Sequence, residues 1–260
     1  MNFGYSFAGA FVGFLVGLTG VGGGSLMAPI LILFFGFQPA VAIGSDLWFA
    51  AVTKSVGGGV HRQVGSPNWK IAGRLALGSV PAAVLTLLWL GYARGGHLEA
   101  HFLLKLLGAA LIFSACLLPL KGRLETTFKT LRSHLGDSMR SHQFALTILG
   151  GAAVGCLVTL TSVGAGALVA VLLMMLYPLS LKARALVGTD IVHAVPLALV
   201  AAVGHSIFGN VDWSLLGMLL LGSIPGIIAG SLVAGKVNDD LVRIALSVML
   251  AISGAKLLLA

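Results

Sequence analysis

Long apolar segments separated by short polar connections fill almost the whole chain. The segments lie at residues 3–35, 40–61, 71–92, 102–120, 144–177, 185–208, 213–235 and 241–259. Six of them contain about 20 residues, the length that an apolar helix needs to cross the hydrocarbon core of a bilayer. We therefore predict an all-α integral membrane protein.

The first and fifth segments are too long for a single crossing. Each contains about 33 residues, whereas a helix that rises 1.5 Å per residue crosses a ~30 Å core in about 20. Glycine clusters at residues 20–24 and 164–166 interrupt the two segments. We predict that each segment is a Gly-broken helical hairpin, with a new helix beginning after the tip, near Ser25 and near Ala167.

The same succession of motifs occurs twice along the chain. With an offset of 144 residues, Gly44-Ser45-Asp46 recurs as Gly188-Thr189-Asp190. The same offset aligns the Leu-Gly-Ser-Val-Pro of residues 77–81 with the Leu-Gly-Ser-Ile-Pro of residues 221–225. Upstream, an offset of 142 residues aligns the two glycine clusters. Such agreement at chemically awkward residues predicts a duplicated unit.

The duplication divides the chain into three parts. We predict a first membrane repeat at residues 1–120, a basic linker at 121–143 and a second membrane repeat at 144–260. Each repeat would consist of one broken hairpin followed by three transmembrane helices.

The basic residues predict how the repeats lie in the membrane. Lys and Arg are enriched on the cytoplasmic side of membrane proteins. We place the linker in the cytoplasm and count each hairpin as two crossings. Seven further basic residues then also lie at cytoplasmic ends: Arg62, Lys70, Arg74, Lys182, Arg184, Lys236 and Arg243. Each repeat then has an odd number of segments, so the two repeats have inverted topologies, which is typical of secondary transporters.

The composition agrees with a membrane protein. Of the 260 residues, 58% are hydrophobic and 9% are charged, whereas soluble domains contain roughly 25% charged residues. The formal net charge of +8 fits cytoplasmic loops, and no basic patch with interleaved aromatic residues indicates nucleic-acid binding. Cys116 and Cys156 lack the spacing of a metal site or a disulfide framework. We expect no metal, no cofactor and no enzymatic activity.

The tips of the two hairpins are the first candidates for a substrate site. A helix start exposes unpaired backbone N–H groups and a partial positive charge, so two starts facing one cavity would bind an anion. Glycine would let a ligand approach these groups closely. The residues expected to contact the anion in this way are Gly22, Gly23, Gly24, Ser25, Gly164, Ala165 and Gly166. The alternative is that the glycines only allow close helix packing.

Polar side chains inside the apolar segments are further candidates for the substrate site. Lys54 would add positive charge to an anion pathway; the alternatives are a structural pair with Asp190 or an amine that reaches the interface. The hydroxyls of Ser45 and Thr189 would donate hydrogen bonds to the anion. His193 is either a ligand contact or proton carrier, or a packing histidine.

The two aspartates of the repeated motif have two interpretations. Asp46 and Asp190 either cap the helix of the second segment of each repeat, or have a functional role, as carboxylates that couple transport to protons or as groups that orient the hairpin tip. We expect them near opposite faces of the membrane, which argues against a catalytic dyad. His61 and His205 are expected near membrane ends as interface anchors.

These residues resemble those of the sulfite exporter TauE/SafE family of membrane transporters. The resemblance rests on the duplicated glycine-rich hairpin, the Gly-Ser/Thr-Asp that follows it and the repeated Leu-Gly-Ser-Val/Ile-Pro, and it covers essentially the whole chain. It implies transport of sulfur-containing anions such as sulfite or organosulfonates across a bacterial or archaeal inner membrane. The second repeat departs from the pattern, with Ala165 and Ala167 in place of Gly23 and Ser25.

The combined expectation is a secondary carrier of a small sulfur-containing anion. Alternating access would take place around a central site between the two broken hairpins. The alternatives are a passive anion channel and an intramembrane aspartyl protease that uses Asp46 and Asp190. The expected partners are the anion and the lipid bilayer, not nucleic acid, and the sequence leaves both a monomer and a homodimer open.

Overall fold

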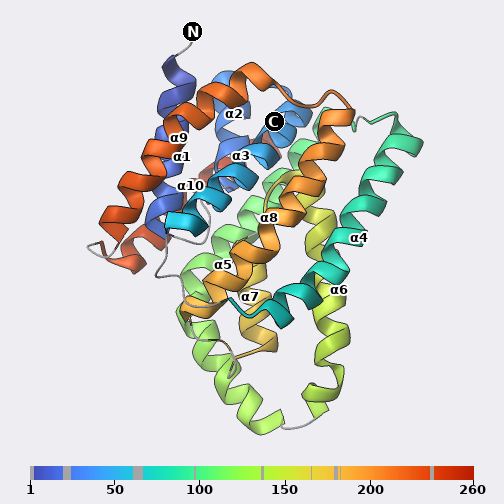
Figure 1. The fold of residues 1–260 in the computed structure, drawn as a ribbon, viewed down its shortest axis with the longest axis vertical. Helices are drawn as coiled ribbons and strands as arrows, with labels where there is room; N and C mark the ends of the chain where they lie inside the picture. The colour runs from blue at the N-terminus through green and yellow to red at the C-terminus, as the bar shows by residue number, and fades with distance from the viewer. Residues whose placement is uncertain are drawn as a thin grey trace.

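The computed structural model describes residues 3–19, 25–60, 67–96, 98–135, 138–164, 166–178, 181, 183–234 and 237–260. Within these ranges the secondary structure is helical, and Figure 1 shows the helices as one bundle. The helices are α1 (Phe3–Thr19), α2 (Met27–Phe35), α3 (Pro39–Val60), α4 (Trp69–Arg94), α5 (Ala100–Leu135), α6 (Ser138–Thr161), α7 (Ala167–Leu176), α8 (Ala183–Ile207), α9 (Trp213–Val233) and α10 (Asp239–Leu259). The predicted all-α class is confirmed.

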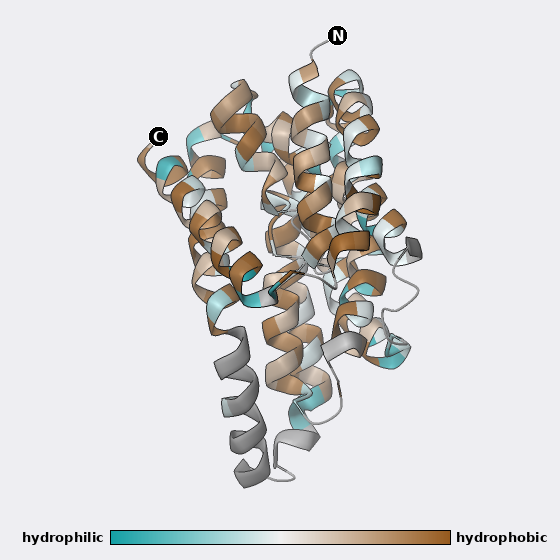
Figure 2. Cartoon of the chain, turned by 90° about the vertical axis from the view of Figure 1, so that its left-hand side faces the viewer, coloured by the Kyte–Doolittle hydropathy of each residue, from teal (hydrophilic) through white to brown (hydrophobic). Residues whose placement is uncertain are grey.

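The outer surface of the bundle is apolar, as a bilayer requires. Among the described residues, α4, α5, α6, α8, α9 and α10 are long and apolar enough to cross a membrane. Large apolar side chains on their outer sides are exposed, including Leu88 on α4 and Leu232 on α9. Figure 2 shows hydrophobic residues along the lengths of these helices. Because exposed apolar surface on this scale would be unstable in water, the chain is an integral membrane protein.

Each of the two long apolar segments forms a long helix followed by a short one. α1 is followed by α2, which has 9 residues, and α6 is followed by α7, which has 10. At 1.5 Å per residue the short helices extend about 15 Å, half the thickness of the hydrocarbon core. The predicted helix start near Ala167 is confirmed. The first short helix begins at Met27, two residues after the expected Ser25.

The two halves of the chain are interlocked, because each of two interfaces takes one helix from each half. α1 packs along α9, and α6 packs along α4. On α1, Gly9, Gly13 and Gly17 lie directly against the backbone of α9, and on α6, Gly151 and Gly155 lie against the backbone of α4 in the same way. A Cβ atom at any of these positions would overlap main-chain atoms. Glycine is therefore needed here for the close approach of two helices.

The remaining contacts repeat this two-fold pattern. α3 packs against α8, and α5 packs against α10 with Gly108 and Gly254 at the crossing point. Matching helices also run in opposite directions along the long axis of the molecule. In Figure 1, α4 rises from the lower to the upper part whereas its counterpart α9 descends.

The repeated Gly-Ser/Thr-Asp motif connects these interlocked helices. Gly44 lies against the carbonyl of Asn210, where a Cβ atom would not fit. The next residue, Ser45, accepts a hydrogen bond from the backbone N–H of Asp212 at 3.2 Å. In the second copy, Thr189 accepts from the backbone N–H of Asn68 at 2.9 Å. Each motif therefore holds the start of a helix in the other repeat, since Asn68 and Asp212 are the N-caps of α4 and α9.

Candidate functional site

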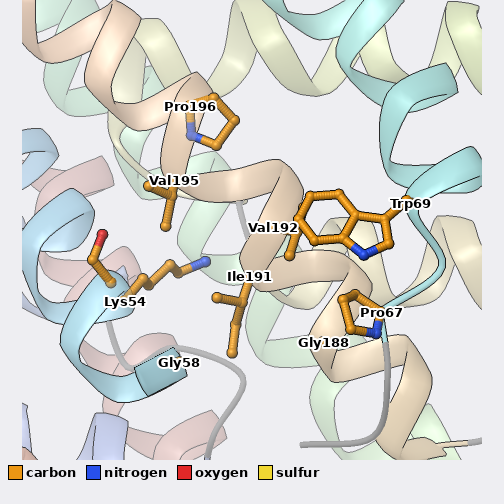
Figure 3. Close-up of a pocket in the computed structure, with 10 residues that line it drawn as sticks. Lys54, Gly58, Pro67, Trp69, Gly188, Ile191, Val192, Val195 and Pro196 are labelled. Carbon is orange, nitrogen blue, oxygen red and sulfur yellow. The ribbon is translucent and has the colours of Figure 1, made fainter. Parts of the chain in front are cut away.

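A cavity of about 500 Å³ lies between α3 and α8, beside the start of α4 (Figure 3). The residues that line it come from both repeats: Lys54, Ser55, Gly58, Pro67, Trp69, Gly188, Ile191, Val192, Val195 and Pro196. Most of these side chains are apolar, and Lys54 supplies the positive charge. The size and the mixed lining suit a small ligand with one anionic group.

Lys54 extends from α3 toward α8 at one wall of the cavity. Its side chain is 6% exposed, and its Nζ atom lies 3.6 Å from Oδ2 of Asp190, which is fully buried. Figure 3 shows the amine pointing toward the part of α8 that carries Ile191 and Val192. One turn further along α3, Gly58 lets α8 approach, because a Cβ atom there would lie 3.1 Å from the side chain of Ile191. The structure thus forms the ion pair that the sequence left as one alternative for Lys54.

The two aspartates do not cap their own helices, so that interpretation is wrong. α3 begins at Pro39 and α8 at Ala183, which places Asp46 and Asp190 two turns inside these helices. The residues before each Gly-Ser/Thr-Asp motif already belong to the helix. The helix therefore begins before the motif and not at it. Asp46 instead accepts a hydrogen bond from the backbone N–H of Ala28 at 3.3 Å, in the first turn of α2.

The expected position of the two aspartates near opposite membrane faces stays a prediction. Both side chains are completely buried inside the bundle. Lys54, on the same helix as Asp46, forms its ion pair with Asp190 of α8. Lys54, Asp46 and Asp190 are thus all buried side chains of α3 and α8.

The hairpin tips are only partly described. Gly22, Gly23, Gly24 and Ala165 lie outside the described residues. The starts of both short helices are visible: Leu26 and Gly166 occupy the N-cap positions, and neither supplies a side-chain hydrogen bond. Ser25 is half-buried in a short turn before α2.

The second tip reaches the carboxyl group that contacts the first short helix. Gly164 (φ 116°) and Ser162 (φ 59°) both have left-handed backbone conformations, which is unusual for serine. Ser162 lies near the Asp46 carboxyl group. Asp46 therefore lies between the start of α2 and the turn that joins α6 to α7.

The predicted hydroxyl donors already have partners within the bundle. The Thr189 hydroxyl donates to the carbonyl of Ala185 at 2.6 Å and accepts from Asn68, so its one hydrogen is in use. Ser45 lies against the start of α9. In this arrangement both residues position helices, and their donation to an anion stays a prediction.

His193 and His205 are both buried in the bundle. His193 Nε2 forms a 2.8 Å hydrogen bond with the Ser79 hydroxyl, so the two residues link α8 to α4. His205 is 4% exposed and its Nε2 lies 2.9 Å from the carbonyl of Thr159. The prediction that His205 anchors the interface is therefore wrong, because the side chain points into the bundle where α6 passes. His61 lies outside the described residues. Among the described residues, no group of three His, Cys, Asp or Glu side chains could hold a metal ion.

Sequence reasoning missed the apolar wall of the cavity. Ile191, Val192, Val195 and Pro196 are ordinary residues for an apolar helix, and nothing in the pattern marks them as lining residues. Pro196 interrupts the hydrogen-bond pattern of an apolar helix, which is a weak signal at most.

Comparison with known proteins identifies the family of the chain. The model of the sulfite exporter TauE/SafE family matches residues 5–257. The chain belongs to the TauE/SafE family. The probable membrane transporter protein YjnA of Bacillus subtilis is 37% identical over 96% of this chain and 97% of its own length. The probable membrane transporter protein MJ0441 of Methanocaldococcus jannaschii is 26% identical over 95% of this chain and 93% of its own.

Membership makes the chain a multi-pass membrane transporter. A further relative, the probable membrane transporter protein YdhB of Bacillus subtilis, is 28% identical over 95% of the chain and 96% of its own length. No solved structure is significantly similar to this TauE/SafE protein.

Proposed function

We propose that this protein is a secondary carrier of a small sulfur-containing anion, and that the anion binds beside Lys54 in the cavity between α3 and α8. The observation that carries the proposal is a buried amine at the wall of a cavity shared by the two repeats. In the bilayer such a charge is costly and by default functional. A sulfonate or sulfite group would accept hydrogen bonds from the ammonium group.

The lining of the cavity favours an organosulfonate over sulfite itself. Ile191, Val192 and Val195 form an apolar surface next to the amine. An anion with a short carbon chain would bury that chain against these residues, whereas sulfite has no apolar part to bury. We therefore expect affinity to rise with each methylene group until the cavity is filled.

Alternating access requires that the two faces of the site open in turn. The interlocked pairs α1–α9 and α4–α6 are tightly packed and suit rigid units, while α3 and α8 lie between them. We propose inverted repeats with a site near the midplane, a cytoplasmic linker at residues 121–143, and a location in a bacterial or archaeal inner membrane. The described tip residues Ser25, Gly164 and Gly166 are not among the residues that line the cavity, so the proposed site does not depend on them.

Ligand binding to the purified protein tests the proposal directly. Thermal unfolding is measured with sulfite, sulfate and a series of alkylsulfonates from methane- to butanesulfonate. A ligand at 100 times its dissociation constant adds about 2.7 kcal/mol to the free energy of unfolding. We expect stabilisation by sulfonates that increases with chain length. No stabilisation by any of these anions would remove the substrate assignment.

Flux in proteoliposomes separates a carrier from a channel. Uptake of the best labelled sulfonate should saturate, and unlabelled sulfonate trapped inside should accelerate it by counterflow. Linear, non-saturating flux without counterflow would instead establish the passive anion channel.

The aspartyl protease has less support from the geometry. A catalytic dyad needs two carboxyl groups that share one proton. Here Asp190 pairs with Lys54, and Asp46 accepts from the backbone of α2. These separate partners favour roles in binding and in helix position.

A further inference from the structure

Lys54 and Asp190 are on different helices and on different repeats, and their charges meet beside the cavity. The 3.6 Å contact joins α3 to α8, and both side chains are almost completely buried. An ion pair in such surroundings stabilises the fold only weakly on balance, because desolvation of both charges opposes their attraction. Its position next to a ligand-sized cavity indicates a use in transport.

A bound anion would place a third charge in this interior. With the amine protonated and the carboxylate ionised, the site carries no net charge before binding and one negative charge after it. Net charge in a low-dielectric interior costs free energy. One proton added to a carboxylate would restore neutrality.

We propose that the anion replaces Asp190 as the partner of Lys54 and that Asp190 takes up one proton in the same step. The proton comes from the bulk solution on the side from which the anion enters, as hydronium or buffer acid, and an oxygen of the Asp190 carboxylate accepts it. Before binding, the ammonium of Lys54 pairs with the carboxylate; afterwards it pairs with the sulfonate, and Asp190 is a neutral acid. Anion and proton then cross together, without net charge movement. This mechanism rests on the proposed anion site and names its coupling ion.

The other buried ionisable groups are less suited to accept the coupled proton, because each has a partner away from the ion pair. On α3, the Asp46 carboxyl group contacts the start of α2. On α8, His193 is bonded to Ser79 of α4 and His205 to the backbone of α6. At the end of α7, the Tyr177 hydroxyl is bonded to Thr147 of α6 and to Arg74 of α4. Asp190 is the acid that combines ion-pair contact with Lys54 and a position between two residues of the cavity wall, Gly188 and Ile191.

Proton uptake on binding is the first measurement. Calorimetry of propanesulfonate binding to the full-length protein is carried out in two buffers with different ionisation enthalpies. A sulfonate stays ionised near neutral pH, so any proton taken up goes to the protein. We expect about one proton per anion bound, by linkage of binding to protonation. Binding without proton uptake would overturn the coupling and leave the anion site intact, whereas absence of binding would count against the proposed function itself.

The Asp190→Asn variant is the second measurement, because the amide imitates the neutral acid. In liposomes that contain wild-type protein, an acidic exterior should drive propanesulfonate accumulation by about ten-fold per pH unit, the equivalent of one proton per anion. Asp190→Asn should still bind and exchange the anion, but without proton uptake and without response to the pH gradient. The matched control is Asp240→Asn, the same change at an exposed ion pair with Arg243, which should behave as wild type.

A variant that does not fold still leaves the proposal open to refutation. Asp190→Glu keeps a titratable group and should keep the pH-driven accumulation. If Asp190→Asn retains gradient-driven accumulation, Asp190 does not carry the proton. If the wild-type protein exchanges the anion but does not respond to the gradient, no proton is coupled to transport.

Discussion

At the scale of single residues, Lys54 is the charge on which the anion site depends. Replacement by alanine leaves the buried Asp190 carboxylate without this ion-pair partner. We expect Lys54→Ala to lower the affinity for propanesulfonate at least ten-fold, which corresponds to about 1.4 kcal/mol. The loss of ligand-induced thermal stabilisation measures the effect. Lys54→Arg, which keeps the charge, should retain part of it, and Lys105→Ala on the exposed side of α5 should change nothing. Full binding by Lys54→Ala would show that the anion lies elsewhere.

Asp46 acts on a helix that precedes its own in the chain. Its Oδ2 atom accepts from the N–H of Ala28, in a helix whose N-cap residue provides no side-chain acceptor. Because removal of a capping side chain costs about 1 kcal/mol, Asp46→Ala should lower the melting temperature and speed amide hydrogen exchange at Ala28. Asp46→Asn keeps an acceptor oxygen and should be milder. Unchanged exchange at Ala28 in the alanine variant would contradict this role.

At the scale of elements, the interlocked helix pairs depend on glycine. Gly13 on α1 lies against the backbone of Ser223 on α9, where a Cβ atom has no space. We expect Gly13→Ala to destabilise the protein by about 2 kcal/mol, since overpacking at a rigid contact typically costs 1–3 kcal/mol. Thermal unfolding in detergent measures the change. The matched control is Gly217→Ala on α9, where nothing lies within 4 Å of an added Cβ atom; a helical alanine there should be neutral or stabilising.

The helices themselves could be predicted from the sequence, but their pairing could not. Apolar segment length located five of the six long apolar helices, α4, α5, α8, α9 and α10. The sixth, α6, is the first part of the second glycine-broken segment. A repeated sequence does not indicate whether a helix packs against its own half of the chain or against the other half. The packing of α1 on α9 and of α6 on α4 could therefore not be predicted. The capping roles of Asp46 and Asp190 were misassigned for a related reason. A short polar motif inside an apolar run resembles a helix start, although the helix already began seven residues earlier.

Of the residues that line the candidate site, the sequence predicted the charged Lys54 but not the apolar side chains. Lys54 stands out because a lysine in an apolar helix is rare. Ile191 and Val192 are indistinguishable in sequence from residues that face lipid, and only the three-dimensional arrangement identifies them as lining the cavity.

At the scale of the whole molecule, the orientation of each repeat can be tested by labelling. In a background with Cys116 and Cys156 replaced by alanine, single cysteines are placed at Arg94, Thr127 and Asp240. For inverted repeats with a cytoplasmic linker, a membrane-impermeant thiol reagent should reach position 94 from outside and positions 127 and 240 only after the membrane is opened. The labelled fraction is measured with intact and permeabilised cells. Labelling of position 240 in intact cells would mean that α6 and α7 together cross the membrane once.

The glycine-lined interfaces between the repeats have a consequence for how the protein is made. While the ribosome is still producing the linker, α1 and α4 are already in the bilayer, but the surfaces that match them belong to helices not yet synthesised. Assembly of the bundle therefore has to wait for α6 and α9, and lipid must cover the glycine faces until then. In a chain that ends before α9, the glycine face of α1 would lack its packing partner. We expect such a chain to be recognised and degraded by membrane quality control.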